Sequence, residues 1–363
     1  MSLLRTKPAV FAVGDKYQIM VPISEPSLMW VQVGEKKYFD HSNGIIRSEV
    51  DLQKMEVPAS ELEAAGEYTL CWRKVINRKP YYSETENVEK VTYKFYPVPA
   101  ENAKAYHISD AHGMIDQPVA AAKTFEKLAG EIDFLILNGD ITNSNDKPED
   151  FDNIYLIAEK LTRGEKPVVF SRGNHDMRGL FAEKFEYYTP SRKGKTYYPF
   201  RLGSIWGLVL DCGEDKFDEC TEYGNTICCE PFRREETGFI DEIIGKKQFE
   251  EDGVKHKMII SHFTFTRKQK PPHDIEEDLF KEWAKTIKDG IAPDFILYGH
   301  EHRLEFELPG GENDKNGHPC PVIVGSDIKG EKNYFAGVGF VFGEEIKVIY
   351  TDSNGEIVME KEI

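Results

Sequence analysis

The ten residues PVVFSRGNHD, at positions 167–176, join an apolar run to a polar motif. The run 167–171 is short, rich in β-branched and aromatic side chains and followed by a glycine, which is typical of a fully buried strand. The motif GNHD at 173–176 offers an amide oxygen, an imidazole and a carboxylate. A match of this kind arises by chance in a chain of this length on the order of once in several hundred cases. We therefore take it as the anchor of a functional site.

The region after Tyr96 alternates apolar strands with amphipathic helices. Strands are expected at 105–109, 134–138, 167–171, 205–211, 257–261 and 295–298, and helices near 118–129, 149–162, 234–247 and 276–288. From Leu304 onward the helices stop, and the segments 320–325, 334–342, 345–351 and 356–361 indicate an antiparallel sheet. This alternation predicts an α/β unit that the antiparallel sheet closes.

The first hundred residues show short alternating stretches between turn residues, which is strand spacing. The expected strands are 17–22, 28–33, 36–39, 67–74 and 91–96. Tyr68, Leu70 and Trp72 share one face of their strand and are expected to point inward. The run 65–68 resembles the tyrosine corner of immunoglobulin-like and fibronectin-like sandwiches, with Leu70 where an antibody domain has its second Cys. We expect residues 8–98 to form an all-β sandwich of about seven strands, either a packing and spacer module or a ligand-binding one.

Composition limits the possible functions. A chain of 363 residues exceeds one ordinary core, so two domains are expected. Its 63 Asp and Glu against 46 Lys and Arg give a net charge of -17, which repels polyanions, so no nucleic-acid partner is expected. No apolar run approaches the roughly 20 residues that span a bilayer, so no membrane partner is expected. The sequence does not indicate the oligomeric state.

The N-terminal segment and the cysteines bear on the cellular location. Residues 1–11 carry two early charges and lack an apolar run of signal-peptide length, so we expect a cytoplasmic protein, unless a leader peptide has been removed. The cysteines form no CxxC framework and are expected to be reduced thiols. They are Cys71, Cys212, Cys220, Cys228, Cys229 and Cys320. No role is predicted for the adjacent pair Cys228 and Cys229.

Polar side chains follow five of the expected strands of the α/β unit. They are Asp110 and His112, Asp140, Asn174 and His175, His262, and His300 and His302. In open α/β sheets the ligand crevice lies beyond the carboxyl ends of the strands, so these positions are expected to meet. Carboxylate, imidazole and amide ligands without a Cys suit a catalytic site for divalent first-row ions. In the run 299–302, an extended backbone would point both imidazoles the same way and Glu301 elsewhere.

Each motif also has a simpler interpretation when it is taken alone. The Asp-x-His run at 110–112 is typical of a turn with a helix cap, and Asp140 after Gly139 is typical of an Asx turn. A lone His262 is typical of a hydrogen-bonded core histidine. The remaining histidines are expected to be structural or surface residues: His41, His107, His256, His273 and His318. The occurrence of all five motifs in order favours one shared site.

With D-x-H, GD, GNH[DE], H and GHxH in order, residues from about 104 to 343 resemble the calcineurin-like metallophosphoesterase family. The resemblance implies a four-layer αββα sandwich and two divalent metal ions. It implies that one metal is held by Asp110, His112, Asp140 and His302, and the other by Asp140, Asn174, His262 and His300. Mn, Fe, Zn or Ni would suit such ligands.

The resemblance also implies catalytic roles. His175 would contact the phosphate and assist the leaving group, with Asp176 orienting it. The metals, roughly 3.5 to 4 Å apart, would acidify a water so that hydroxide attacks phosphorus in line. The residues predicted to bind substrate are Asn174, His175 and Arg234. The last lies in a long polar connection, 211–236, that we expect to face the substrate; a solvated surface charge is the alternative for Arg233 and Arg234.

The domain order, with a sandwich first, is similar to that of purple acid phosphatases. We therefore predict an α+β protein with an immunoglobulin/fibronectin-like β-sandwich at 1–98 and a metallophosphoesterase domain at 99–363. Those enzymes carry a metal-bound Tyr where this chain has Asn143, so a redox-active iron pair is not expected. The predicted function is dimetal-dependent hydrolysis of small phosphate esters. The alternatives are a cyclic-nucleotide or other phosphodiesterase, which GNHD in place of GNHE favours slightly, a nuclease, or a non-catalytic binding protein that uses the sandwich.

Overall fold

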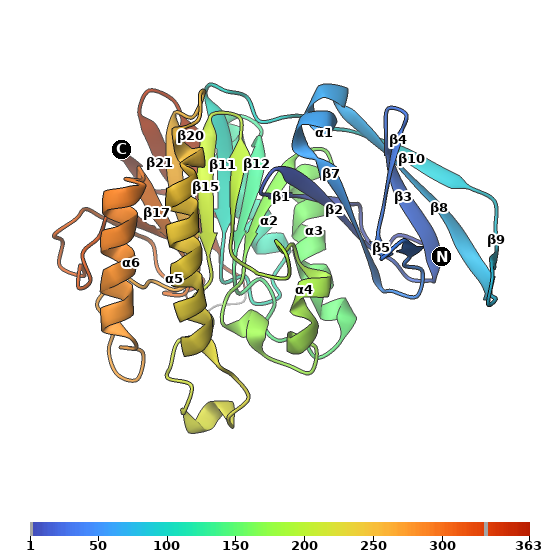
Figure 1. The fold of residues 1–363 in the computed structure, drawn as a ribbon. Helices are drawn as coiled ribbons and strands as arrows, with labels where there is room; N and C mark the ends of the chain where they lie inside the picture. The colour runs from blue at the N-terminus through green and yellow to red at the C-terminus, as the bar shows by residue number, and fades with distance from the viewer. Residues whose placement is uncertain (1–2, 330–332) are drawn as a thin grey trace.

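The computed structural model describes residues 3–329 and 333–363, and within them three main sheets form the framework (Figure 1). The largest has nine strands in the order β22-β21-β20-β11-β12-β13-β1-β2-β7. A six-stranded sheet has the order β14-β15-β16-β17-β19-β18. A smaller sheet has the order β10-β8-β3-β4, with β9 beside β8.

The middle of the nine-stranded sheet is parallel and buried, except for the partly exposed Lys104. It consists of β11 (Ala103–Ile108), β12 (Phe134–Asn138) and β13 (Pro167–Ser171). Parallel strands that are apolar on both sides need cover on both faces. Helices α2 (Asp116–Ala129) and α3 (Asp152–Thr162) cover one face, where the ring of Phe125 lies over the Cα of Gly339.

The six-stranded sheet covers the other face. Its parallel core is β15 (Ile205–Leu210), β16 (His256–Ser261) and β17 (Phe295–Tyr298). Its remaining strands are β14 (Tyr198–Leu202), β18 (Glu305–Glu307) and β19 (Val322–Val324). Helices α5 (Cys229–Lys246) and α6 (Glu277–Gly290) pack on its outer side, where they bury Ile243 and Trp283 in one core with Ile259. Two sheets thus lie between two helix layers, which confirms the predicted αββα arrangement (Figure 1).

The C-terminal strands β20 (Ala336–Phe342), β21 (Ile346–Asp352) and β22 (Ile357–Glu362) are antiparallel and extend the nine-stranded sheet at one edge. At its other edge lie β1 (Ala9–Val13), β2 (Lys16–Pro22) and β7 (Leu52–Pro58). They join it because β1 pairs in parallel with β13, with Val10 opposite Pro167. The hydrogen-bonded ladder therefore crosses the boundary predicted between residues 98 and 99, and the division into two domains stays a prediction.

The smaller sheet completes the N-terminal sandwich. It contains β3 (Ser27–Val33), β4 (Lys36–Phe39), β8 (Glu67–Arg78), β9 (Ser83–Thr85) and β10 (Glu89–Lys94). Tyr68, Leu70 and Trp72 of β8 are buried, as predicted. The Tyr68 hydroxyl donates to the carbonyl of Gly164 at 2.7 Å, so it ties the sandwich to the loop that follows α3.

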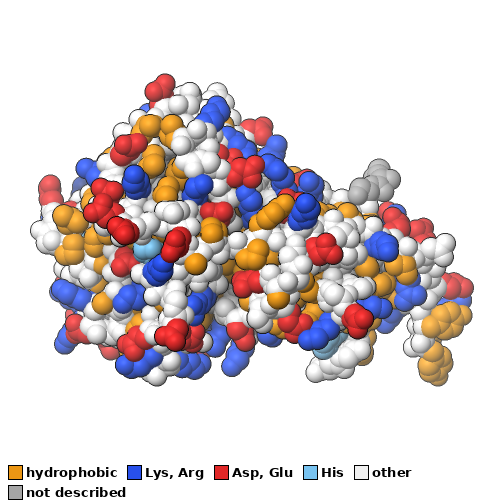
Figure 2. Space-filling view, turned by 90° about the horizontal axis from the view of Figure 1, so that it is seen from above, with side chains coloured by type: hydrophobic (Ala, Val, Ile, Leu, Met, Phe, Trp, Pro, Cys, Tyr) orange, Lys and Arg blue, Asp and Glu red, His pale blue; other side chains and the backbone are white. Residues whose placement is uncertain are grey.

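The remaining elements are short. They are β5 (His41–Ser42), β6 (Ile45–Ile46), α1 (Ala59–Ala65), α4 (Phe185–Tyr188) and 3-10 turns at Pro148–Phe151, His175–Met177, Ala182–Lys184, Thr221–Tyr223 and Gln248–Glu250. The six cysteines are free thiols, as predicted. Among the described residues, no helix has the length and apolar character needed to cross a membrane. On the face seen in Figure 2, acidic and basic side chains are interspersed.

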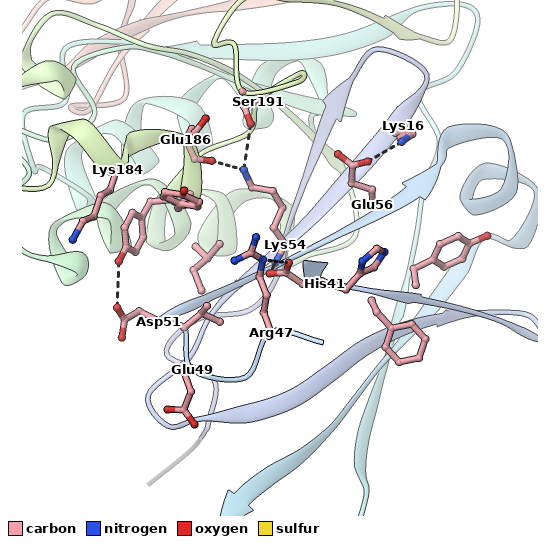
Figure 3. A pocket seen from close by; sticks show the side chains of 18 of the residues that line it. Lys16, His41, Arg47, Glu49, Asp51, Lys54, Glu56, Lys184, Glu186 and Ser191 are labelled. Atoms are coloured by element: carbon pink, nitrogen blue, oxygen red, sulfur yellow. Dashed lines mark hydrogen bonds and ion pairs between the residues drawn. The ribbon is translucent and has the colours of Figure 1, made fainter. Parts of the chain in front are cut away.

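A cavity of about 860 Å³ lies where the sandwich meets the segment 184–194 (Figure 3). Lys54 of β7 crosses this junction, because its ammonium donates to the carbonyls of Glu186 at 2.6 Å and Thr189 at 2.7 Å. The cavity is lined by residues of β4, β7 and α4 and by none of the predicted site residues. This cavity therefore lies between the sandwich and the segment 184–194, and not at the strand ends that carry the predicted site residues.

Candidate metal centre and active site

The five predicted loops meet at the carboxyl ends of β11, β12, β13, β16 and β17. Asp140 Oδ2 lies 3.3 Å from His262 Nε2, and Asp110 Oδ1 lies 3.4 Å from His302 Nε2. Among the described residues, three groups of side chains have ligand atoms within 4.8 Å of one another: Asp110, His112 and His302; Asp110, Asp140 and His262; and His112, Asp140 and His175. Residues far apart in the chain thus form one cluster of carboxylates and imidazoles.

Asn174 and His300 complete the cluster. The amide oxygen of Asn174 lies 3.1 Å from His300 Nδ1. Asp110 and Asp140 are almost fully buried, at 0% and 1% exposure, whereas His302 is exposed enough to reach solvent. All seven side chains predicted to hold metal therefore lie together, with the carboxylates at the bottom and His302 at the rim.

Five of these side chains are attached to backbone in the left-handed region. The φ angles are +53° at Asp110, +45° at His112, +53° at Asp140, +70° at His300 and +49° at His302. The extended backbone expected for 299–302 is therefore wrong. A tight turn forms instead, because the Glu301 N–H donates to the Gly299 carbonyl at 2.8 Å. Strained backbone of this kind persists only where the surrounding structure fixes it, and it gathers at functional sites.

Three glycines allow the loops to approach so closely. A Cβ on Gly139 would lie 2.6 Å from the Gly173 nitrogen and from the His262 ring. A Cβ on Gly173 would lie 2.2 Å from Asp140 Oδ1, and one on Gly299 would lie 1.9 Å from the Ser109 hydroxyl. The glycines of GD, GNHD and GHEH are thus required for packing of one loop on another.

The buried carboxylates of Asp110 and Asp140 need a nearby positive charge to stay ionised. Burial lowers the pKa of His262, but Asp140 and Asp110 outweigh burial and raise this pKa to about 10. Burial raises the pKa of Asp140, but the neighbouring His262, His175 and His112 hold it well below its usual range. In the protein alone, a proton on His262 meets this need; a bound cation would meet it as well.

The donor atoms fit such a cation. The Nδ1 of His262 lies 2.8 Å from the Asn138 carbonyl, so Nδ1 carries a hydrogen. With a cation in place of the second proton, the lone pair of Nε2 would face the cluster. Among the described residues, this buried Nε2 and the buried Nδ1 of His112 have no hydrogen-bond partner. Carboxylate, imidazole and amide donors around unsatisfied nitrogens are a set that divalent first-row ions bind.

A model of the calcineurin-like phosphoesterase family matches residues 103–304. The chain belongs to this family. It is therefore a metallophosphoesterase, a hydrolase of phosphate esters, and the family implies divalent metal ions. No curated protein sequence matches the chain.

Solved structures resemble this phosphoesterase at low sequence identity. A purple acid phosphatase from yellow lupin (Lupinus luteus) seeds is 13% identical, with a TM-score of 0.60, over 99% of this chain and 73% of that one. GAP50, the anchor in the inner membrane complex of Plasmodium, is 12% identical, with a TM-score of 0.46, over 72% of this chain and 88% of that one. Vps29 of Chaetomium thermophilum is 11% identical, with a TM-score of 0.32, over 72% of this chain and 96% of that one. The lupin likeness spans both halves, so the sandwich followed by the αββα unit is a shared fold.

Asp176 and the His175 ring have separate hydrogen-bond partners in this phosphoesterase, unlike the predicted arrangement in which Asp176 orients His175. The imidazole Nδ1 of His175 lies 3.1 Å from the Asn143 carbonyl. The carboxylate of Asp176 accepts hydrogen bonds from the backbone of Asp140 at 3.0 Å and of Gly173 at 2.8 Å. Burial and the charge of Asp140 raise the pKa of Asp176. Asp176 thus joins the GD and GNHD loops, and the carbonyl of Asn143 orients the His175 ring.

The predicted substrate residue Arg234 does not contact the cluster within the described part of the chain. Its side chain is 60% exposed and pairs with Glu230 one helical turn away, which fits the surface-charge alternative. Arg233 is buried, donates to Glu276 at 2.8 Å and to the Cys212 carbonyl at 2.6 Å, and so holds the start of the loop. Both belong to α5, which begins at Cys229, five residues before the predicted helix start.

Sequence reasoning missed two groups beside the phosphoesterase cluster. The guanidinium of Arg178 lies 3.1 Å from His175 Nε2. Asp215, from the polar loop, lies 3.6 Å from His300 Nε2 and 3.0 Å from His273 Nδ1. Arg178 ends the 3-10 turn His175–Met177, and its N–H donates to the His175 carbonyl at 3.1 Å, so the spacing of three residues is the signal that could have found it.

Proposed function

We propose that this phosphoesterase hydrolyses small phosphate esters at a two-metal centre. The proposed ligands are Asp110, His112, Asp140 and His302 for one ion, and Asp140, Asn174, His262 and His300 for the other. The observation that carries the proposal is the buried Nε2 of His262, which lies 3.3 Å from Asp140 and 3.9 Å from Asp110, between two buried carboxylates that would need a cation. Two divalent cations, Mn, Fe, Zn or Ni, would neutralise these carboxylates and supply Lewis-acid activation and an acidified water.

His175 is the proposed proton donor to the leaving group. Its Nδ1 is next to a carbonyl, which accepts a hydrogen and never donates one, so Nε2 is the nitrogen that gains and loses the catalytic proton. Asn174 and His175 are consecutive residues beside the cluster, and we propose that the phosphate binds next to them. Asp176 is proposed as a positioning residue, because its carboxylate fixes the backbone that carries Asp140 and Gly173.

The proposed substrate is a small ester, and the sandwich at 1–98 is proposed as a packing module. Cleavage of both phosphate monoesters and diesters is compatible with the cluster. The purple acid phosphatase likeness does not bring iron redox chemistry with it, because Asn143 stands where those enzymes carry a metal-bound Tyr, and its backbone carbonyl lies against His175. No nucleic-acid partner is proposed, since the net charge of -17 opposes long polyanions.

The test compares two single substitutions in the full chain loaded with manganese. Asp140→Asn is expected to abolish hydrolysis of p-nitrophenyl phosphate and of bis(p-nitrophenyl) phosphate, and to lower the manganese content. His175→Ala is expected to keep the manganese and to lose roughly 10²- to 10⁴-fold in kcat, the usual contribution of a general acid. Unchanged turnover in Asp140→Asn would refute the proposal, and loss of manganese in His175→Ala would refute the division of roles.

A further inference from the structure

Arg178 lies at the edge of the cluster, and its guanidinium donors are divided between Glu214 and His175. Its Nε and Nη2 donate to the two carboxylate oxygens of Glu214 at 3.1 and 3.2 Å. Its Nη1 lies 3.1 Å from His175 Nε2. The arginine side chain is 32% exposed, whereas the Glu214 side chain is 3% exposed. Glu214 thus holds one edge of the guanidinium, and the other edge faces His175.

The loop that follows β15 fixes the position of the Glu214 carboxylate that pairs with Arg178. Glu214 accepts a hydrogen bond from the Tyr223 hydroxyl at 3.2 Å, and the same hydroxyl lies 3.1 Å from Asp215. Burial lowers the pKa of Arg178, but Glu214 outweighs burial and raises it, so the guanidinium stays charged. An Arg with a purely structural role would direct its last donors to a carbonyl or a carboxylate. Here a donor on Nη1 faces His175 Nε2, the nitrogen that is proposed to give its proton to the leaving group.

We propose that Arg178 binds the phosphoryl oxygens of the substrate and that Glu214 positions it for this task. The proposal rests on the proposed phosphoesterase function. A guanidinium matches phosphate oxygens in geometry and charge. Without substrate, Nη1 caps His175 Nε2. With substrate bound, Nη1 donates to a phosphoryl oxygen, and Nε2 becomes free to face the leaving-group oxygen.

The two residues have different expected signatures. Arg178 touches the substrate, so its removal weakens the binding of any phosphate, reactive or not. Glu214 acts through Arg178, so its removal matters only while Arg178 is present. A charged hydrogen bond to phosphate corresponds to roughly a 10- to 100-fold change in affinity.

The experiment uses the manganese-loaded full chain and its variants Arg178→Ala, Arg178→Lys and Glu214→Gln. Arg201→Ala is the matched control, because the Arg201 side chain is 35% exposed and also pairs with a glutamate, Glu251. In Arg178→Ala, the KM for p-nitrophenyl phosphate and the inhibition constant of inorganic phosphate are expected to rise together by roughly 10- to 100-fold, with unchanged manganese content. Added guanidinium chloride should restore part of the loss, Arg178→Lys should retain part of the affinity, and the control should match the wild type.

Glu214→Gln should raise KM by less than Arg178→Ala, should not respond to guanidinium, and should add nothing to the Arg178→Ala variant. An unchanged inhibition constant for phosphate in Arg178→Ala overturns the proposal, and so does a loss of kcat that guanidinium does not restore. If the wild type hydrolyses no ester, the proposed function fails on its own. Calorimetric binding of inorganic phosphate to the wild type and to Arg178→Ala still decides the role of Arg178 in that case.

Discussion

Gly139→Ala tests whether the loops at the site are packed as tightly as their geometry indicates. Gly139 has a φ of +76°, and a Cβ there would lie 2.6 Å from the Gly173 nitrogen and from two atoms of the His262 ring. Neither neighbour can move freely. The Gly173 N–H donates to Asp176 at 2.8 Å, and His262 Nδ1 is held by the Asn138 carbonyl at 2.8 Å.

The magnitude follows from two separate costs. A left-handed backbone costs a residue with a Cβ about 1 to 2 kcal/mol, and forced overlap in a packed interior costs about 1 to 3 kcal/mol more. Gly310→Ala is the control, because Gly310 has a similar φ of +82° and a Cβ there would meet no atom within 4 Å. Gly139→Ala should therefore lower the free energy of unfolding by about 1 to 3 kcal/mol more than Gly310→Ala does.

Two measurements check this expectation. Urea titration followed by circular dichroism gives the free energy of unfolding for both variants, and elemental analysis gives manganese per chain. Gly139→Ala should also lose manganese, because Asp140 and His262 flank the added methyl group. Equal unfolding free energies for the two variants, together with full manganese content, would show that the loops have more room than the structure gives them.

Three other expectations concern stability. Burial lowers the pKa of Lys54 from 10.5 to about 8. Between pH 8 and pH 10.5 the unfolded chain therefore binds more protons than the folded one, so the free energy of unfolding rises with pH. Lys54→Met should lose this rise, which urea titrations at about pH 8 and about pH 10 would measure. Glu301→Gln leaves Arg267 and Arg303 facing a neutral amide and should cost about 2 kcal/mol of unfolding free energy by urea titration, against less than about 0.5 if these pairs contribute nothing. Chelation should lower the Tm in calorimetry, since an ion at 100 times its Kd contributes about 2.7 kcal/mol, and an unchanged Tm would contradict a bound ion.

The buried parallel strands were predictable because a short, continuously apolar run bounded by turn residues is typical of a strand that is covered on both faces. The bounds of β12, β13 and β17 agree with the predicted segments. Each is a run of this kind. The start of α5 was missed because Pro231 was taken as part of a loop. Proline is tolerated in the first turn of a helix, where its missing N–H has no partner to lose.

Strand partners were not predictable from a single sequence. The pairing of β1 with β13 joins Val10 to Pro167 across most of the first half of the chain. Periodicity shows that both segments are buried strands, but it carries no information on which edge each one meets. The helix α1 was missed for a related reason, because seven residues between two strands show too few turns for a helical period to emerge.

The sequence predicted the candidate metal ligands of the site, but not the side chains that surround them. Strand ends marked the seven predicted ligands, since only strand ends converge in this architecture. Arg178 and Glu214 meet through side chains from two loops, and no spacing in the sequence links them. Arg234 was favoured because it stands in a polar segment, yet that segment is a helix whose outer face it occupies.

Backbone strain explains why the site needs the rigid sheets beneath it. Five candidate ligands have left-handed φ angles, which together cost about 5 to 10 kcal/mol. This cost is similar to the whole stability of an ordinary domain, about 5 to 15 kcal/mol. Hydrogen bonds such as that from the His300 N–H to Asp110 at 3.1 Å offset part of it, but the larger compensation must come from the buried strands that end at the loops. A loop on a flexible surface would relax out of these conformations, and the ligand atoms would then separate.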